Sequence, residues 1–171
     1  MTGTGPLAGL RVLDVGTRIA APFCAGLLGE QGAEVVKIEQ PGTGDFLRAV
    51  GPYDDGYSLF WAVEGRGRKS VTLDLRRPDG QEVFRRLAAT ADVVVENFRP
   101  GTLERWGIAP GRWEPRPVWV RISAFGQDGP YSQRPGLDRI GIAAGGLLHI
   151  TGYPDRPPVR VGVAKIGRAH V

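Results

Sequence analysis

Short apolar runs alternate with helix-like segments along this chain, and that alternation limits the possible folds more than any other feature. In the first unit, a predicted strand at 10–15 is followed by a helix at 20–28 and a strand at 34–39. Strands joined by such a crossover pair in parallel. The same reading continues with strands at 70–75, 93–95 and 118–123 and helices at 78–91, 101–106 and 137–148. We therefore predict an α/β fold with a Rossmann-like, open, mostly parallel sheet and helices on both faces.

Composition excludes several classes of protein. The 171 residues are 42% hydrophobic, enough for the core of one domain. No apolar run reaches the length of about 20 residues that a membrane-spanning helix needs. The N-terminus lacks a secretory signal, and a single cysteine excludes a disulfide framework, so we expect a cytoplasmic protein. The net charge of +4 is too small and too dispersed to indicate a nucleic-acid partner.

The first strand-to-helix loop, 16–22, tests for a common nucleotide site. Open parallel sheets bind ligands beyond the carboxyl ends of their strands. The loop lacks the Gly-x-Gly-x-x-Gly spacing of dinucleotide-binding proteins, and no P-loop pattern occurs in the chain. An ordinary NAD or ATP site is therefore not expected, and a plain strand-to-helix turn stays open as an interpretation.

An ordered series of short motifs runs from Pro6 to Ala164. No single piece is specific, but the whole set in this order is. The pieces are PLAGLRVLD at 6–14, LGEQGAEVVKIE at 28–39, RKSVTLDL at 68–75, DVVVENFRPG at 92–101, SAFGQDGP at 123–130 and GGLLHITG at 145–152. The series resembles the class III CoA-transferases, the formyl-CoA transferase and CaiB/BaiF family.

The resemblance implies an acyl-CoA enzyme whose N-terminal Rossmann-like domain, here 1–164, holds the nucleotide end of coenzyme A (CoA). The implied partners are an acyl-CoA, a carboxylic acid acceptor and a second copy of the chain in an interlocked homodimer. Neither a metal nor a covalently bound cofactor is implied. The residues placed at the CoA site by the resemblance are Ile19, Ala20, Gln40, Leu73, Asp74, Leu75, Arg76, Asn97, Phe98, Arg99 and Arg105.

Two points qualify this assignment. Gln40 stands where formyl-CoA transferase has an arginine, which removes a cation next to the phosphorylated ribose; Arg18 or Arg48 could replace it. Asp14 and Asp74 fall within predicted strands, so we interpret their side chains as structural.

The catalytic groups lie near the end of the chain. In the related α-methylacyl-CoA racemases a histidine matching His149 is a catalytic base, a role that suits imidazole. The alternative is a histidine that interacts with the dipole of the predicted helix end. The family's nucleophilic aspartate is expected at position 167, where this chain has Gly167.

The last seven residues, 165–171, match no part of the family. The final six, IGRAHV, correspond to a translated sequencing adapter, so we predict that native sequence stops at Ala164. A genuine divergent terminus is the alternative.

The function expected from the resemblance is transfer of CoA from a thioester to a free carboxylic acid through an aspartyl-CoA intermediate. This chain is then an N-terminal fragment without activity of its own. A racemase-type enzyme and a non-catalytic CoA-binding module stay open as alternatives. Cys24 is expected to pack inside its helix rather than to act as a nucleophile.

Overall fold

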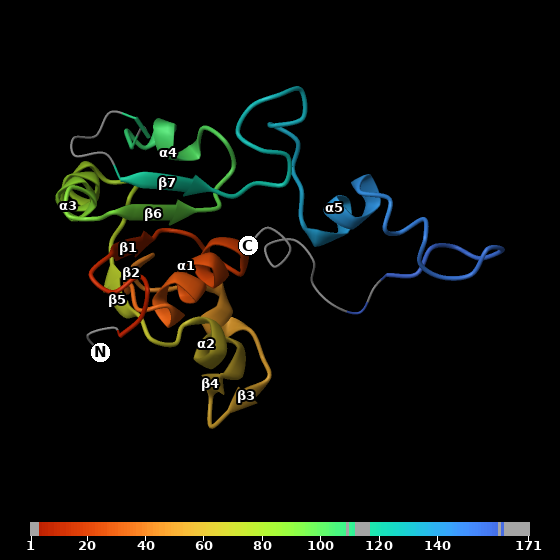
Figure 1. Ribbon diagram of the computed structural model, residues 1–171, viewed down its shortest axis with the longest axis horizontal. Helices are drawn as coiled ribbons and strands as arrows, with labels where there is room; N and C mark the ends of the chain where they lie inside the picture. The colour runs from red at the N-terminus through yellow and green to blue at the C-terminus, as the bar shows by residue number, and fades with distance from the viewer. Residues whose placement is uncertain (1–3, 109, 112–116, 161, 163–171) are drawn as a thin grey trace.

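The computed structural model describes residues 4–108, 110–111, 117–160 and 162. Seven strands, five α-helices and one 3-10 helix are formed within these residues (Figure 1). In chain order they are β1 Arg11–Asp14, α1 Ala20–Glu30, β2 Glu34–Glu39, η1 Phe46–Ala49, β3 Tyr53–Asp54, β4 Tyr57–Ser58, α2 Leu59–Glu64, β5 Lys69–Thr72, α3 Pro78–Ala88, β6 Val93–Glu96, α4 Thr102–Arg105, β7 Val118–Arg121 and α5 Asp138–Ala144.

Five strands form one sheet in the order β5-β2-β1-β6-β7, and every pairing in it is parallel. At the centre, Leu13 of β1 pairs with Val36 of β2 and Val94 of β6. The predicted α/β sheet is thus confirmed. The chain moves outward in one direction from β1 through β2 to β5 and in the other from β6 to β7. Loops at the carboxyl ends of β1 and β6 therefore diverge, which is where sheets of this type hold ligands.

The alternating side chains of the strands build a core on each face of the sheet. Leu13 and Val94 point toward α3 and pack in one cluster with its Phe84. Val12 and Val95 point the other way and pack with Ala21 and Ala25 of α1. Since successive strand residues face opposite sides, helices cover both faces as predicted.

Helix α3 buries one face against the sheet. Phe84 and Ala88 are fully buried, whereas Val83 is 43% exposed. Spacing of four residues places Gly80, Phe84 and Ala88 on the face against the sheet. A Cβ at Gly80 would lie 2.1 Å from the carbonyl oxygen of Asp74, so only glycine lets the helix begin so close to the preceding segment.

Several predicted boundaries also change. Strand β5 ends at Thr72 rather than at residue 75, so Asp74 lies beyond the strand. The predicted helix 137–148 is formed only over Asp138–Ala144. It ends there because Gly145 and Gly146, which are poor helix formers, follow. Between β2 and β5 the chain forms η1, the β3–β4 hairpin and α2, for which no element was predicted.

Residues 123–160 extend away from the sheet (Figure 1). Ile142 is the buried residue of α5, whereas Leu137, Ile150 and Tyr153 are each at least 69% exposed. Among the described residues, no helix is long and apolar enough to cross a membrane.

Candidate functional site

A cleft of about 200 Å³ opens at the carboxyl ends of β1 and β2. Side chains from six stretches of the chain line it. They are Val15, Gly16 and Thr17 after β1; Ile38, Glu39 and Gln40 at the end of β2; Gly44 and Asp45 before η1; Leu73, Asp74, Leu75 and Arg76 after β5; Phe98 after β6; and Trp106 after α4.

Six of the residues predicted for CoA binding line this cleft: Gln40, Leu73, Asp74, Leu75, Arg76 and Phe98. Phe98 and Trp106 pack edge to face with their ring centroids 5.2 Å apart. The cleft thus combines aromatic and aliphatic walls with a few polar groups, which is the usual make-up of a small-molecule site.

The other predicted residues lie outside the lining. Ile19 and Ala20 form the start of α1, where Ile19 is the N-cap residue and no side chain caps the helix. Arg99 and Arg105 are exposed, and Arg105 donates to the Thr102 hydroxyl at 2.9 Å. Asn97 precedes the cleft residue Phe98, and its side chain hydrogen-bonds the backbone of Thr17.

Backbone groups of the β1–α1 loop are held by side chains. The Gly16 N–H donates to Asp14 Oδ1 at 3.1 Å, and the Arg18 N–H donates to Asp45 Oδ1 at 3.3 Å. Asn97 accepts from the Thr17 N–H at 2.9 Å and donates to the Thr17 carbonyl at 2.8 Å. Three successive N–H groups are therefore satisfied within the protein, so this loop does not offer them to a phosphate as a dinucleotide-binding loop does.

Close packing enforces glycine at the first position of this loop. A Cβ on Gly16 would lie 2.3 Å from the Ala21 side chain and 2.9 Å from Asn97 Oδ1. The loop is consequently pressed between the start of α1 and the residue after β6.

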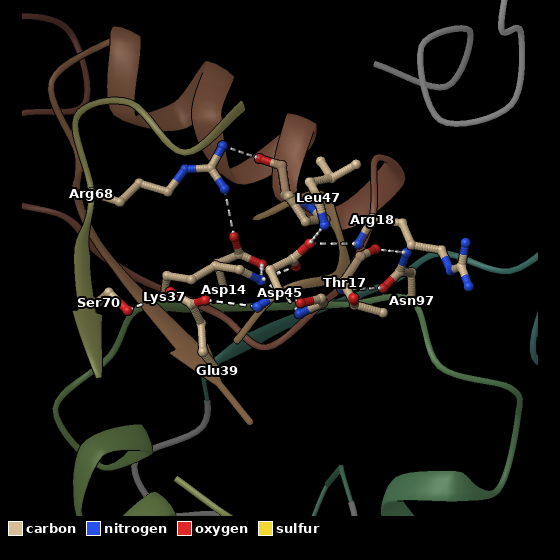
Figure 2. Close-up of polar contacts among 12 residues, drawn as sticks. Asp14, Thr17, Arg18, Lys37, Glu39, Asp45, Leu47, Arg68, Ser70 and Asn97 are labelled. Atoms are coloured by element: carbon tan, nitrogen blue, oxygen red, sulfur yellow. Dashed lines mark hydrogen bonds and ion pairs between the residues drawn. The ribbon is translucent and has the colours of Figure 1, made fainter. Parts of the chain in front are cut away.

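A cluster of buried charges lies below the loop (Figure 2). Lys37 Nζ lies 3.5 Å from Asp14 Oδ1 and 3.2 Å from Asp45 Oδ2, and it also donates to the Gly16 carbonyl. Arg68 Nη1 lies 2.7 Å from Asp14 Oδ2. Burial raises the pKa of Asp14, and Lys37 and Arg68 oppose that rise. The two cations thus compensate two carboxylates in a site that water does not reach.

Glu39 is held in a second ion pair at the end of β2. Its carboxylate accepts from Arg48 Nε and Nη2, each at 2.7 Å, from the Ser70 hydroxyl and from the Asp45 N–H. Burial alone would raise the pKa of Glu39, but these hydrogen bonds outweigh it and lower the pKa to about 2. Arg48 also lies over the Trp61 ring of α2 at 3.9 Å, which fixes the direction of its fork.

Asp74 at the rim is paired with Arg76 by two contacts, at 2.8 and 3.0 Å. Hydrogen bonds from the Arg76 side chain, and then from its backbone N–H, lower the pKa of Asp74 to about 2. Every carboxylate that lines the cleft is therefore neutralised by a partner: Glu39 by Arg48, Asp45 by Lys37 and Asp74 by Arg76.

Among the described residues, three arginines that follow cleft-lining residues or end α4 form no ion pair within 4 Å, although Arg105 interacts electrostatically with Glu104: Arg18, Arg99 and Arg105. Arg18 adopts a φ of 65° and lies over the Phe46 ring at 3.9 Å. These guanidinium groups are therefore available to an anionic ligand.

The residues suggested for catalysis are not brought to the cleft. His149 is exposed and follows α5, outside any helix. Burial raises the pKa of the Cys24 thiol and Asp14 adds to the rise, consistent with a packed, unreactive thiol. Gly167 and the tail 165–171 lie outside the described residues. In the part of the chain that the structure describes, no cluster of His, Cys, Asp and Glu could hold a metal ion.

Sequence reasoning missed the charged cluster. Lys37 interrupts the apolar run of β2 between Val36 and Ile38, and a lysine at such a position requires buried anions. That signal was present, but the identity of its partners depends on how Asp14 and Asp45 are brought together by the fold.

Comparison with known proteins identifies the family and related sequences. The model of CoA-transferase family III matches residues 7–166. Succinyl-CoA–D-citramalate CoA-transferase of Chloroflexus aurantiacus is 48% identical over 93% of this chain and 40% of its own length. The beta subunit of succinyl-CoA–L-malate CoA-transferase from the same organism is 50% identical over 94% of this chain and 41% of its own length.

Solved structures agree as well. A CaiB/BaiF family protein from Brucella suis superposes with a TM-score of 0.84 at 37% identity, covering 94% of this chain and 44% of that one. Protein Rv3272 of Mycobacterium tuberculosis gives 0.87 at 36% identity, covering 98% and 47%. The chain spans about 40% of the length of the curated relatives it matches. The chain belongs to CoA-transferase family III.

Proposed function

We propose that this chain is the N-terminal, CoA-binding part of an acyl-CoA:carboxylate CoA-transferase. The observation that carries the proposal is the cleft at the divergence of the β1 and β6 loops, in a chain that matches CoA-transferase family III over residues 7–166. The nucleotide end of CoA occupies this cleft, with Phe98 and Trp106 on one side. Arg18 and Arg105 approach the phosphates from the rim.

The reaction proposed for the complete enzyme exchanges CoA between two acids. An aspartate carboxylate attacks the thioester carbonyl of the acyl-CoA and releases the CoA thiolate, leaving a mixed anhydride. The thiolate then attacks the aspartyl carbonyl and expels the free acid, giving an aspartyl-CoA thioester. The acceptor carboxylate then takes the CoA by the same two steps in reverse, which frees the aspartate. Relatives named for succinyl-CoA favour succinyl-CoA as the donor.

The 171-residue chain has Gly167 where this mechanism needs the aspartate, so we propose that it binds CoA without exchanging it. We also retain the proposal that residues 165–171 are not native. An unbroken genomic reading frame through Val171 would contradict the second proposal, and CoA exchange by the purified chain would contradict the first.

Calorimetric titration of the purified chain with CoA tests the binding site. Gln40 lines the cleft beside Asp74, so Gln40→Glu should weaken binding about tenfold and Gln40→Arg should strengthen it. Gln133 is exposed in the C-terminal segment and provides matched controls, Gln133→Glu and Gln133→Arg, which should bind like the wild type. Absence of CoA binding, or equal effects at the two glutamines, would contradict the proposed site.

A further inference from the structure

We propose that Lys37 and Asp45 are positioning residues that hold the two walls of the cleft in register, an inference that rests on the proposed binding of CoA there. One wall is the β1–α1 loop, represented by Gly16 and Thr17. The other is the segment before η1, represented by Gly44 and Asp45. Figure 2 shows the Lys37 ammonium group between them.

Lys37 connects three separate parts of the chain. Its side chain is 1% exposed, and its Nζ contacts the Gly16 carbonyl, Asp14 Oδ1 at 3.5 Å and Asp45 Oδ2 at 3.2 Å. A lysine leaves water only where its charge is compensated. Asp14 already has Arg68 as a partner, so the contact specific to Lys37 is the one to Asp45.

The Asp45 carboxylate contacts both walls through one oxygen and Lys37 through the other. Its Oδ1 accepts from the Leu47 N–H at 2.9 Å, which caps η1, and from the Arg18 N–H at 3.3 Å. Its Oδ2 accepts no hydrogen bond and faces Lys37 Nζ at 3.2 Å. The side-chain carboxylate is 1% exposed, so this ion pair is shielded from water.

The consequence is a preorganised cleft. Without the pair, the Gly16 carbonyl loses its ammonium partner and the Arg18 N–H loses its fixed acceptor, so the loop between β1 and α1 keeps mainly its ties to Asn97. The loop would then have to be ordered when the ligand binds, and this entropic cost would lower the affinity for CoA. A purely structural pair would instead change stability and leave affinity intact.

Asp45→Asn is the discriminating variant because asparagine caps helices as well as aspartate does. If its amide oxygen keeps the contacts to Leu47 and Arg18, its NH₂ group faces the Lys37 ammonium. If the amide flips, the oxygen meets Lys37 and the two N–H contacts are lost. Either orientation breaks one link between the walls. Lys37→Met combined with Asp45→Asn removes both charges while keeping side chains of similar size.

The experiment measures CoA affinity by calorimetry and amide exchange at Thr17 and Arg18 by NMR, far below the unfolding temperature. We expect about a tenfold loss of affinity and faster exchange in Asp45→Asn and in the double variant. Val94→Ala is the control, because Val94 is fully buried but does not line the cleft. It should lose stability and keep both affinity and loop exchange.

The outcomes separate the two proposals. If the wild type binds CoA and Asp45→Asn binds it equally well, the positioning role is overturned and the CoA site stands. If Val94→Ala weakens binding as much as Asp45→Asn, only stability is at work and the positioning role is again overturned. If the wild type does not bind CoA, both proposals fall. If the double variant does not fold, Asp45→Asn alone decides.

Discussion

The sheet region, residues 11–121, and the C-terminal segment, residues 123–160, both contain large apolar residues but use them differently. Every core residue of the two buried clusters belongs to the sheet region. In the C-terminal segment, Leu137, Ile150 and Tyr153 point into solvent, and α5 buries Ile142. A hydrophobic sequence therefore does not by itself give a buried one; parallel pairing supplies a surface on which helices can pack.

The same contrast holds for charge. Three ion pairs of the sheet region, such as Arg68 with Asp14, are almost completely buried, while others on its surface, such as Lys69 with Glu34, are exposed. In the described part of the C-terminal segment, Arg160 pairs with Asp138 at 3.7 Å and the arginine is 49% exposed. Buried pairs contribute to a unique arrangement of the loops around the cleft, whereas exposed pairs are screened by water and salt.

The largest expected effect comes from breaking a buried pair. Arg68→Met leaves Asp14 with Lys37 as its remaining cation and removes the contact to the Pro22 carbonyl. We expect a loss of about 4 kcal/mol in the free energy of unfolding, measured by urea denaturation. Arg160→Met, the matched change in the C-terminal segment, should cost less than about 1 kcal/mol. Similar losses of stability in the two variants would show that the buried pair contributes no more than the exposed one.

A matched pair of leucines sharpens the difference in packing. Leu13 of β1 is fully buried, whereas Leu137 before α5 is 70% exposed. Leu13→Ala should lower the free energy of unfolding by about 3 kcal/mol, because it removes apolar contact and leaves a cavity in the core. Leu137→Ala should change it by less than about 0.5 kcal/mol. The same urea titration checks both, and a large effect at Leu137 would show that the C-terminal segment has a core of its own.

The difference between the regions also explains which predictions from sequence succeeded. The strands of the sheet were found because apolar runs such as Val93–Val95 lie between clear turn residues, and their parallel pairing follows from the helical crossovers. The helix predicted at 137–148 was too long because Gly145 and Gly146, which are poor helix formers, follow Ala144.

Part of the cleft lining could be predicted. Gln40 and residues 73–76, which the family resemblance places at the CoA site, line the cleft. The clamp of Asn97 on Thr17 could not, since those residues are 80 positions apart and their contact depends on the order of the strands. The partner of Lys37 was likewise hidden in the sequence, because Asp45 lies in a loop.

A smaller effect is expected from Glu39, through pH. Its pKa is lowered from 4.5 to about 2 in the folded protein. A lowered pKa means that the ionised group stabilises the fold above about pH 4.5 and that this contribution is lost as the pH falls toward 2. Glu39→Gln should therefore lower the free energy of unfolding by about 2 kcal/mol at pH 7 and by much less near pH 2. The value at pH 7 is reduced because Arg48 is partly exposed and water screens the pair.

Urea unfolding at pH 7 and at pH 3 measures that change. The wild type should lose stability between the two values, and Glu39→Gln should lose less. Asp155→Asn serves as the control in the C-terminal segment, where Asp155 makes no ion pair with other described residues; it should shift stability by less than about 0.5 kcal/mol at pH 7. Parallel behaviour of Glu39→Gln and the wild type would mean that the Arg48 pair does not stabilise the fold.

The smallest expected effect is at His149. This histidine is exposed after α5 and does not line the cleft, and its backbone N–H donates to the Gly146 carbonyl at 2.9 Å. A side-chain change leaves that hydrogen bond in place, so His149→Gln should alter the free energy of unfolding by less than about 0.5 kcal/mol. CoA affinity measured by calorimetry should likewise stay within about twofold of the wild type, because an exposed group distant from the cleft adds no contact to the ligand. A tenfold loss of affinity would show that the C-terminal segment contributes to CoA binding, which would contradict the functional difference between the two regions.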